Sequence, residues 1–358
     1  MVCVDSNRFA SQSAMHPFFY HASRSAQPSP TSPTGAITVH RLDEALCVIS
    51  AKGEDALSFL QGQITNDLAA AGLDSACLAG YCTAQGRLLA TGIFSQGPID
   101  PANAASHNIS IVLRADLAAA VAKRLSMFVL RSKVKIAPTA VSVAGVFAPS
   151  HALDSLRSAF AHDLPLTPWQ ALRTTSGTWI AAPASIDTHR WWWLASEHAA
   201  EESPLNWTAL TQTLQAGEAS AWYSTDIQQG LPWIEAKTQD LFIPQTLNLD
   251  LIQGVSFTKG CYPGQEIVAR SHYRGTLKRR MTLARLDVPL DATIAPGVDV
   301  YEGDAPCGRI INISNEGQTS WLLLEAPFDA MDRNALAVGA AHGPRLALQA
   351  LPYAIRAA

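Results

Sequence analysis

Lys259-Gly260-Cys261-Tyr262-Pro263-Gly264-Gln265-Glu266 is the stretch that organises the chain, and it lies between an apolar run at 249–257 and a basic run at 270–280. Its two glycines permit positive φ and the close approach of another segment, and its Pro-Gly pair is typical of a tight turn. We therefore expect Cys261 to lie on a loop. A nearby cation, here Lys259, lowers the pKa of a thiol and makes it reactive. These residues alone leave open a second interpretation, a free cysteine buried in a glycine-bounded turn.

The composition is that of a folded chain with more than one domain. Its 358 residues are 48% hydrophobic and 16% charged, which is too apolar for a disordered chain, and the length is too great for one small core. A formal net charge of −4 argues against nucleic-acid binding over the whole surface. No apolar run reaches the roughly 18 residues that a membrane-spanning helix needs, so we expect no membrane partner.

The six cysteines are scattered along the chain without a CxxC pair. Cys77 and Cys82 are five residues apart, but no second pair has a matching spacing, so we predict no metal site. We expect all six thiols to be reduced, in a reducing compartment.

Residues 1–35 differ from the rest of the chain. They end in a Pro/Ser/Thr-rich linker at 27–34, which predicts disorder. Arg8, Arg24, several serines and a single acid, Asp5, faintly resemble a transit peptide, whereas no continuous apolar segment indicates a secretory signal. We interpret the segment as a nonfunctional extension of a cytoplasmic protein, with the mitochondrial matrix as the alternative location.

Residues 36–137 predict a split βαβ arrangement over an antiparallel sheet. Two short strands flank a turn at Asp43-Glu44, and Asn66 and Asp67 either cap a helix or line a pocket. The other elements that we expect are a helix at 55–60, a hairpin at 78–94, a strand at 108–113, a helix at 116–127 and a strand at 134–136.

A similar series begins at 138, with strands at 141–147, 178–182 and 190–195 and helices at 153–160, 205–214 and 219–229. Trp191 and Trp193 share one face of their strand, because side chains alternate. They either pack in the core or form a stacking wall for an aromatic ligand. From about 278 onward, short strands separated by turns predict a small β-barrel of five or six strands, at 280–286, 298–301, 308–313, 320–324 and 345–348.

Residues 257–266, Phe-Thr-Lys-Gly-Cys-Tyr-Pro-Gly-Gln-Glu, resemble the signature of the YgfZ family. Members of this family are folate-binding proteins linked to iron–sulfur cluster assembly and to tRNA modification. They are related to the T-protein, the aminomethyltransferase of the glycine cleavage system. The resemblance covers roughly residues 36–358, with further agreement at 59–67, 86–89, 130–134, 242–245 and 247–250.

The resemblance implies an α+β, T-protein-like fold. Two ferredoxin-like or split βαβ domains would surround a central folate pocket, and a small antiparallel β-barrel would follow. The implied divisions are a disordered extension at 1–35, a first α+β folate-binding domain at 36–137, a second α+β domain that ends in the signature at 138–275, and the barrel at 276–358.

The resemblance also implies roles for the signature residues. Cys261 would be the functional thiol, and Lys259 would support its thiolate, both as catalytic residues. Arg270 would anchor the loop, while Glu266 either binds a partner or pairs with Arg270 four residues on. The residues that would shape the loop or bind a partner are Gly260, Tyr262, Gly264, Gln265 and Glu266.

Tetrahydrofolate, or a derivative, is the cofactor that the resemblance implies. Its flat pterin needs a slot and hydrogen-bonding partners, and its glutamate tail needs cations. The basic run at 270–280 contains five Lys or Arg and either binds that tail or is a solvated strand and turn. The residues expected to contact the folate are Asn66, Asp67, Gln228, Trp191, Trp193 and Arg274.

The chain departs from the T-protein at two places. The hairpin segment 88–91 has no carboxylate where that enzyme carries an acid for aminomethyl transfer, and Gln228 stands where it has a pterin-reading glutamate. An amide can hydrogen-bond a pterin but cannot serve as a carboxylate in proton transfer. We therefore expect a folate-dependent accessory factor in place of a glycine-cleavage enzyme.

The function that we expect is assembly or repair of iron–sulfur clusters in client enzymes, with an indirect effect on tRNA thiolation. The partners would be the iron–sulfur client or scaffold proteins. Two alternatives remain open. One is a folate-dependent, aminomethyltransferase-like one-carbon transferase, and the other is a direct tRNA-binding module that uses Arg279 and Arg280.

Overall fold

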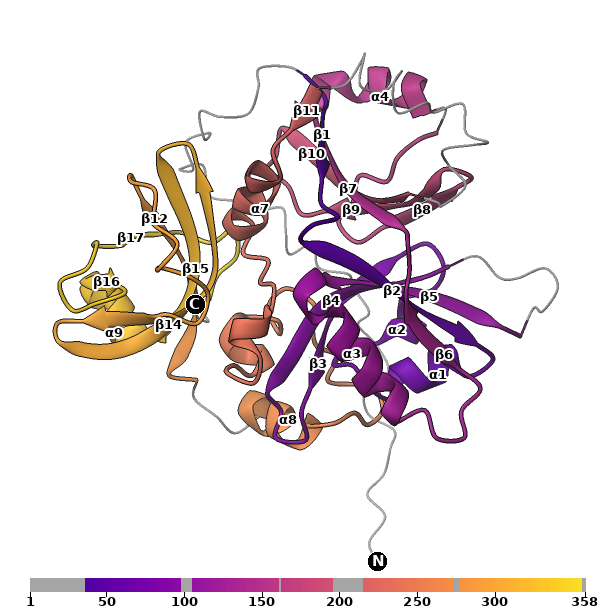
Figure 1. Ribbon diagram of the computed structural model, residues 1–358, viewed down its shortest axis with the longest axis horizontal. Coiled ribbons are helices and arrows are strands. Elements are labelled where there is room, and N and C mark those ends of the chain that lie inside the picture. Colours follow the sequence, from indigo (N-terminus) through magenta and orange to yellow (C-terminus); the bar gives the residue numbers. More distant parts are fainter. Residues whose placement is uncertain (1–35, 98–104, 161, 196–214, 274–276, 356–358) are drawn as a thin grey trace, which may run out of the picture.

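Three β-sheets and the helices that pack on them give the chain a mixed α/β fold (Figure 1). The computed structural model describes residues 36–97, 105–160, 162–195, 215–273 and 277–355. In Figure 1 the third sheet lies on one side, the first two lie one above the other on the opposite side, and the segment that leads into α8 runs between them. No helix among the described residues is long and apolar enough to cross a membrane.

The first sheet is antiparallel, with the strand order β3-β4-β5-β2-β6. The long helix of this unit buries Leu117, Val121 and Leu125, which recur at a spacing of four residues and therefore form one apolar face. The strands and helices predicted here are confirmed: β2 Leu46–Gly53, α1 Ala56–Gln61, α2 Leu68–Ala71, β3 Ala76–Cys82, β4 Leu88–Gln96, β5 His107–Arg114, α3 Ala115–Met127 and β6 Lys135–Pro138.

The second sheet has six strands in the order β11-β1-β7-β10-β9-β8. The strand with three consecutive tryptophans, β10, lies between β7 and β9. Both of its faces are buried because Trp191 and Trp193 pack in one apolar core and Trp192 in another. The elements are β1 Thr38–Arg41, β7 Ser142–Pro149, η1 Ser150–Ala152, α4 Leu153–Phe160, β8 Ala171–Thr174, β9 Gly177–Ala182, β10 Thr188–Ala195, β11 Gln215–Gly217 and α7 Ala219–Gln228. The predicted helix at 205–214 lies outside the described residues.

The third sheet forms a C-terminal β domain with its own buried core. Its strand order is β16-β13-β14-β15-β12-β17, all antiparallel. The elements are β12 Arg279–Leu286, β13 Asp299–Glu302, β14 Ala305–Glu316, β15 Thr319–Pro327, α9 Phe328–Arg333, β16 Leu336–Val338 and β17 Ala347–Gln349. The sequence did not predict α9 or β16, because both are short.

The two strands around Asp43-Glu44 form as expected but belong to different sheets. β1 pairs with β7 and β11, whereas β2 pairs with β5 and β6. The turn between them is held from the second sheet, because the backbone N–H of Val143 donates to an Asp43 carboxylate oxygen at 2.7 Å. The predicted division at 137 therefore does not separate the first two sheets, since β1 crosses it.

The segment that connects α7 to the third sheet also crosses the predicted divisions. It contains η2 Ala236–Thr238, η3 Pro244–Leu247 and α8 Gln265–Tyr273, and it packs along the first sheet. The N–H of Leu88 donates to the carbonyl of Phe242, and the N–H of Asp240 donates to the carbonyl of Leu88, both at 2.8 Å. The predicted 138–275 domain is thus divided in space, because its last part follows β4 instead of the second sheet.

A fully buried ion pair joins the second sheet to α7. The Arg190 guanidinium lies 2.7 Å from Asp226 and 4.0 Å from the centre of the Trp222 ring, and the Trp233 indole donates to the same carboxylate at 3.1 Å. Burial lowers the pKa of Arg190 and raises that of Asp226. Each charge is therefore maintained by the other, and removal of one leaves an uncompensated buried charge.

We predict that Asp226→Ala lowers the free energy of unfolding by about 3–5 kcal/mol, because it strands the buried Arg190 charge. Urea unfolding followed by circular dichroism measures this. Asp154→Ala is the matched control. Its carboxylate pairs with Arg157 while 92% of its side chain is exposed, so we expect a loss of at most about 1 kcal/mol. Equal losses from the two variants would contradict the assignment.

Candidate functional site

The signature loop is held against the turn between β3 and β4 by two glycines. Gly264, with φ +80°, lies so close to Gly86 that an added Cβ would sit 2.5 Å from the Gly86 Cα and 2.5 Å from the Thr83 carbonyl oxygen. Gly86 itself has φ +74°. Gly260 differs from the expectation, because its φ is not positive and its Cβ position is open. The start of α8, just after Gly264, is thus fixed to the first sheet.

Lys259 is buried, and its ammonium group donates to three backbone carbonyls of one segment. The acceptors are the carbonyl oxygens of Gln61, of Ile64 at 2.7 Å and of Asn66 at 3.0 Å. An ammonium group has three donors, so all of them are used by the chain that follows α1. Burial lowers the pKa of Lys259 to about 8, although the carboxylate of Asp67 acts in the opposite direction. The structure therefore gives Lys259 the role of a structural clamp, which differs from the predicted support of a thiolate.

Lys259 and Tyr262 are buried, whereas Gly260 and Cys261 between them are exposed. Tyr262 lies under the Lys259 ammonium, 5.2 Å from the centre of its ring, and burial raises the pKa of its hydroxyl. Phe257 stacks on His272 of α8 with the ring centres 3.8 Å apart. The loop is thus anchored before and after the cysteine, and the thiol is presented to the outside.

The other described cysteines do not share this environment. Burial raises the pKa of Cys77 and of Cys82 to about 12, and it raises the pKa of Cys47 and of Cys307 as well. All are free thiols, and the described residues contain no cluster of His, Cys, Asp or Glu that could hold a metal ion. Cys261 is the exposed cysteine of the described chain.

Asn66 and Asp67, predicted as folate contacts, are used to build the loop. The Asn66 amide donates to the carbonyls of Leu78 at 2.8 Å and Gln253 at 2.6 Å, and its oxygen accepts from the N–H of Asp67. The carboxylate of Asp67 caps α2 by accepting from the N–H of Ala70 at 3.0 Å. Of the two interpretations of this pair, the structure shows the helix cap.

Trp191 and Trp193 are buried in the core of the second sheet, with 0% and 1% of their surface exposed. Trp193 stacks on Trp179 with ring centres 4.9 Å apart, and the Trp191 indole donates to the carbonyl of Pro165 at 2.6 Å. A strand with neighbours on both sides and helices on its faces leaves no open ring surface. The packing alternative is what the structure shows, in place of a stacking wall.

The remaining predicted residues are dispersed. Gln228 ends α7 and is half-buried, while Glu266 and Arg270 are exposed on α8 and form no ion pair with each other within the described chain. Gln265, at the first position of α8, is half-buried, and Arg274 lies outside the described ranges.

Two of the basic residues after α8, Arg279 and Arg280, are already paired. Arg280 is buried and makes a bidentate contact with Asp250 at 2.8 and 2.9 Å. Arg279 makes a similar contact with Glu325, with both distances 2.7 Å. A guanidinium that is paired in this way has lost most of its long-range positive field.

A polar cluster that the sequence did not predict lies where the three sheets meet. Arg114 ends β5, Tyr223 lies on α7, and Glu235 precedes η2, so the three come from distant parts of the chain. The Arg114 guanidinium lies 5.3 Å from the Tyr223 ring centre and 3.6 Å from the Glu235 carboxylate, which also accepts from Asn312 of β14 at 3.1 Å. Arg114 lies more than a hundred residues before Tyr223 and Glu235, so no local pattern connects it with them.

Two atoms of this cluster are buried without a hydrogen-bond partner among the described residues. They are the Tyr223 hydroxyl and Nε of Arg114. Burial raises the pKa of Tyr223 and of Glu235. Because an unsatisfied buried donor costs about 1–3 kcal/mol, such atoms indicate a place where a polar ligand or water supplies the missing partner.

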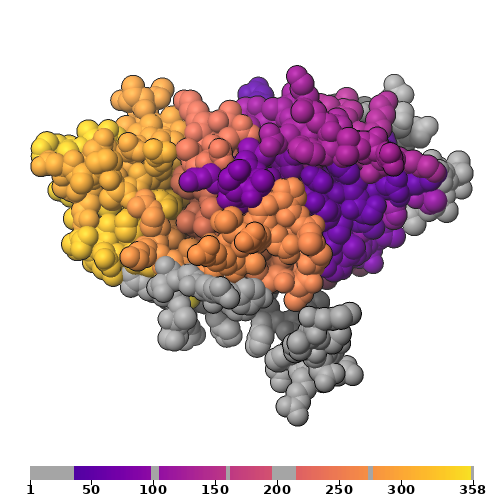
Figure 2. Space-filling model, turned by 90° about the horizontal axis from the view of Figure 1, so that it is seen from below, coloured from indigo at the N-terminus to yellow at the C-terminus, as the bar shows by residue number. Residues whose placement is uncertain are grey.

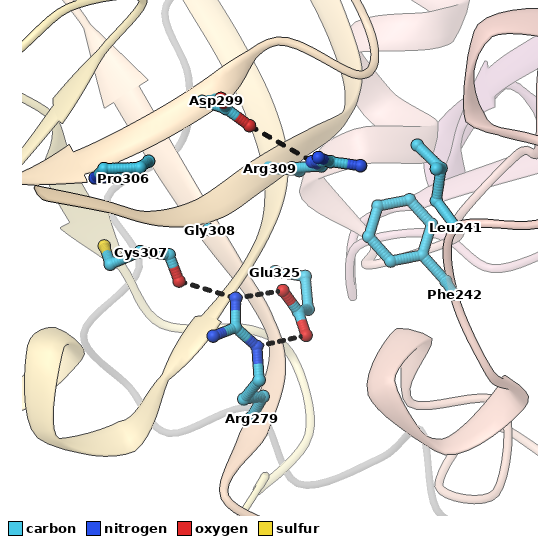
Figure 3. Close-up of a pocket in the computed structure, with 9 residues that line it drawn as sticks. All are labelled: Leu241, Phe242, Arg279, Asp299, Pro306, Cys307, Gly308, Arg309 and Glu325. Atoms are coloured by element: carbon cyan, nitrogen blue, oxygen red, sulfur yellow. Dashed lines mark hydrogen bonds and ion pairs between the residues drawn. The ribbon is translucent and has the colours of Figure 1, made fainter.

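A pocket of about 390 Å³ lies between the C-terminal β domain and the segment before η3 (Figure 3). Leu241 and Phe242 form its apolar side, and the paired Arg279 and Glu325 lie on the opposite side. Arg309 bonds Asp299 at 3.1 Å and points across the pocket toward Phe242. Among the described residues, none of those predicted to contact folate lines this pocket.

The chain is similar to known proteins in its sequence and in its fold. No protein-family model matches the chain. The chain is 30% identical over 263 residues to a tRNA-modifying protein YgfZ of Yersinia pseudotuberculosis, which covers 73% of this chain and 75% of that protein. It is 31% identical over 261 residues to the YgfZ of Edwardsiella ictaluri, with 71% and 73% covered.

A solved structure supports the fold at much lower identity. The glycine cleavage system aminomethyltransferase T from Bartonella henselae superposes with a TM-score of 0.63 over 90% of this chain and 87% of that one. The two sequences are 12% identical, so this likeness shows the fold alone.

We predict that Gly264→Ala lowers the free energy of unfolding by about 2–4 kcal/mol, because it combines positive φ with a backbone clash. Gly260→Ala, in the same loop, should change it by less than about 1 kcal/mol, since its Cβ meets no atom within 4 Å. Chemical denaturation of both variants decides this. A Gly264→Ala variant as stable as the wild type would show that the contact with Gly86 is not formed.

We predict that Lys259 titrates with a midpoint near 8, well below the usual lysine value. NMR of lysine labelled with ¹³C at Cε measures it, and Lys259→Met identifies the resonance. The pKa of Lys259 is lower in the folded state than in the unfolded state. At pH values between these two pKa values, the unfolded state therefore binds more protons. The wild type should therefore gain stability relative to Lys259→Met as the pH rises from about 8 toward 10.5. A midpoint above 10 would contradict the assignment.

Proposed function

The chain belongs to the YgfZ family of tRNA-modifying proteins, and from this premise we propose that it binds a tetrahydrofolate and acts in the assembly or repair of iron–sulfur clusters in client enzymes. Cys261 is the functional thiol of this proposal, and the clients and scaffold proteins of cluster assembly are the partners. The effect on tRNA thiolation is indirect. We place this activity in the cytoplasm, with the mitochondrial matrix as the alternative.

The observation that carries the proposal is the construction around Cys261. Lys259 and Tyr262 are buried on either side of it, Gly264 is fixed to Gly86, and the thiol between them is exposed. A loop that is rigid at both ends and exposes one sulfur atom holds that atom in a defined place for a partner. Thiolate is the soft ligand that iron–sulfur clusters use, so an exposed cysteine suits transient contact with a cluster.

The polar cluster supports the folate part of the proposal better than the residues predicted from the sequence. The unsatisfied Tyr223 hydroxyl and Arg114 Nε fit a ligand with polar ring edges, and the Glu235 carboxylate lies beside them. In this proposal Arg114 and Tyr223 hydrogen-bond the pterin, and Glu235 orients Arg114. When bound, tetrahydrofolate would supply a reduced ring that carries one-carbon units. The first two sheets would then be the two split βαβ domains, and the third would be the small barrel.

A one-carbon transferase is the less favoured function. The hairpin segment 88–91 contains no carboxylate, and its polar side chain, Thr91, is already used. The Thr91 hydroxyl donates to the carbonyl of Pro232 at 3.1 Å and accepts from the N–H of Ile234 at 2.9 Å. No group at this position can take a proton from a substrate amine.

Direct tRNA binding through the basic junction is also less favoured. Arg279 and Arg280 are paired with Glu325 and Asp250. Binding to the phosphates of tRNA needs unpaired cations that can displace the counterions of the RNA. Arg279 and Arg280 are already paired within the fold.

We predict that a change in the polar cluster at Arg114 and a change of the Cys261 thiol have separate effects. Arg114→Gln should weaken tetrahydrofolate binding at least about tenfold, since it removes a charge-assisted donor. Cys261→Ser should leave binding unchanged but abolish support of a cluster-dependent tRNA thiolation enzyme in cells that lack the wild-type gene. Isothermal titration calorimetry measures the first, and mass spectrometry of thiolated nucleosides measures the second.

The matched control for Arg114 is Arg157→Gln, because 61% of the Arg157 side chain is exposed on α4, where it pairs with Asp154. If the wild-type protein does not bind tetrahydrofolate, the folate part of the proposal is wrong. If the Cys261→Ser variant supports full tRNA thiolation, the proposed role of the thiol is wrong and the signature loop has a structural role.

A further inference from the structure

An exposed apolar group lies at the corner where α3 ends and the chain turns into β6. Met127, Phe128 and Leu130 have 68%, 49% and 89% of their surface exposed, within four consecutive residues. The other large exposed apolar residues of the described chain occur singly. Single exposed apolar side chains need no explanation, whereas a contiguous group indicates a binding surface.

The backbone at this corner is strained so that Leu130 points outward. Leu130 has φ +44°, a conformation that costs a residue with a side chain about 1–2 kcal/mol. Burial of the side chain does not compensate, because Leu130 is almost fully exposed. An uncompensated strain that exposes an apolar group favours a functional interpretation over a structural one.

The turn after Leu130 is nonetheless rigid. The N–H of Lys133 donates to the Asp55 carboxylate at 2.7 Å, and the Lys133 ammonium lies 2.6 Å from Glu54. Gly53 lets this turn approach, since an added Cβ would lie 2.0 Å from the Lys133 carbonyl oxygen. The backbone that follows Leu130 is therefore fixed before any partner arrives, which lowers the entropy lost on binding.

The same surface carries a concentration of positive charge. Residues 123–135 contain five cations and no acid, in a chain with a net charge of −4. Lys133 pairs with Glu54, and Arg124 bonds the Tyr81 hydroxyl. Lys123, Arg131 and Lys135 are exposed and form no ion pair with any described residue. Opposite charge on a partner would therefore meet three free cations.

We propose that this 123–135 surface docks an acidic segment of a partner protein that carries apolar side chains. The surface consists of Lys123, Arg124, Met127, Phe128, Leu130, Arg131, Lys133 and Lys135. The partner's apolar side chains pack on Leu130 and Phe128, and its carboxylates lie near the free cations. The small area predicts a transient complex. This docking is independent of the folate proposal.

The partner contributes side chains and does not extend the sheet. β6 is an edge strand that pairs with β2 within the described chain. It begins with Lys135 and ends with Pro138. Lysine and proline on an edge prevent another strand from pairing.

A protein segment fits this surface better than a membrane or an RNA. Glu54 and Asp55 lie at the same corner, and the Glu54 side chain is 43% exposed, so a uniformly anionic lipid surface would be repelled there. Phe128 is the one aromatic ring of this surface, whereas RNA binding by stacking uses a series of rings for successive bases. A fixed strained turn also suits a partner of defined shape.

The test is a selection of random peptides displayed on phage, with the full-length chain as the immobilised target. Leu130→Gly removes the apolar anchor and relieves the strain, so its melting temperature should be unchanged or higher. Lys123→Glu combined with Arg131→Glu reverses the free charge. The matched controls are Ile186→Ser, whose side chain is 79% exposed elsewhere, and Lys278→Glu, which is exposed at another surface.

We expect the selected peptides to combine Asp or Glu with Leu, Phe or Met, and to bind more weakly at high salt. Leu130→Gly and the double charge reversal should each weaken binding at least about tenfold, whereas the two controls should not. Peptides without acids, or peptides that bind Leu130→Gly as well as the wild type, would overturn the proposal. So would phosphatidylglycerol vesicles or single-stranded RNA that bind more tightly than the peptides and respond to the same variants.

Discussion

Three backbone carbonyls surround the ammonium group of Lys259, and the position of the signature loop on the first sheet depends on this contact. Gln61 is the last residue of α1, where the carbonyls of a helix lack partners within the helix. A cation is the group that satisfies several such carbonyls at once. One buried lysine therefore ends a helix, orders the segment 62–66 and fixes the chain that carries Cys261. Its removal would free both segments together.

Polar side chains in this protein divide into those that the fold satisfies and those that it leaves without a partner. Asn66, Asp67 and Thr91 make side-chain hydrogen bonds within the chain, so in this fold they build loops. Arg114 and Tyr223 carry buried atoms without a partner among the described residues. Because of this difference, the candidate ligand contacts are Arg114 and Tyr223, at the junction of the three sheets, and not the residues of the helix cap.

The distribution of free charge follows the same logic. Arg279 and Arg280 are close to the signature in sequence, yet Glu325 and Asp250 neutralise them and make them part of the framework. The cations at 123–135 are distant from the signature, and three of them have no ion-pair partner among the described residues. The surface best suited to an anionic partner is therefore at the end of α3. The ionic framework of the second sheet, Arg190 with Asp226, is fully buried and away from the surface.

The sequence by itself determined the family, the helices and strands with clear periodicity, and a glycine-bounded loop for Cys261, because each depends on residues that are neighbours in the chain. Whether Cys261 is exposed or buried was decided by the tertiary structure. The Gly264 turn and the Asp67 cap are examples of such local chemistry. Only the tertiary structure decided that β1 joins the second sheet, that Trp191 and Trp193 are enclosed, and that Lys259 contacts carbonyls instead of a thiol. It alone brought Arg114, Tyr223 and Glu235 together. Strand pairing and burial depend on contacts between segments far apart in the chain, and local patterns do not specify those contacts.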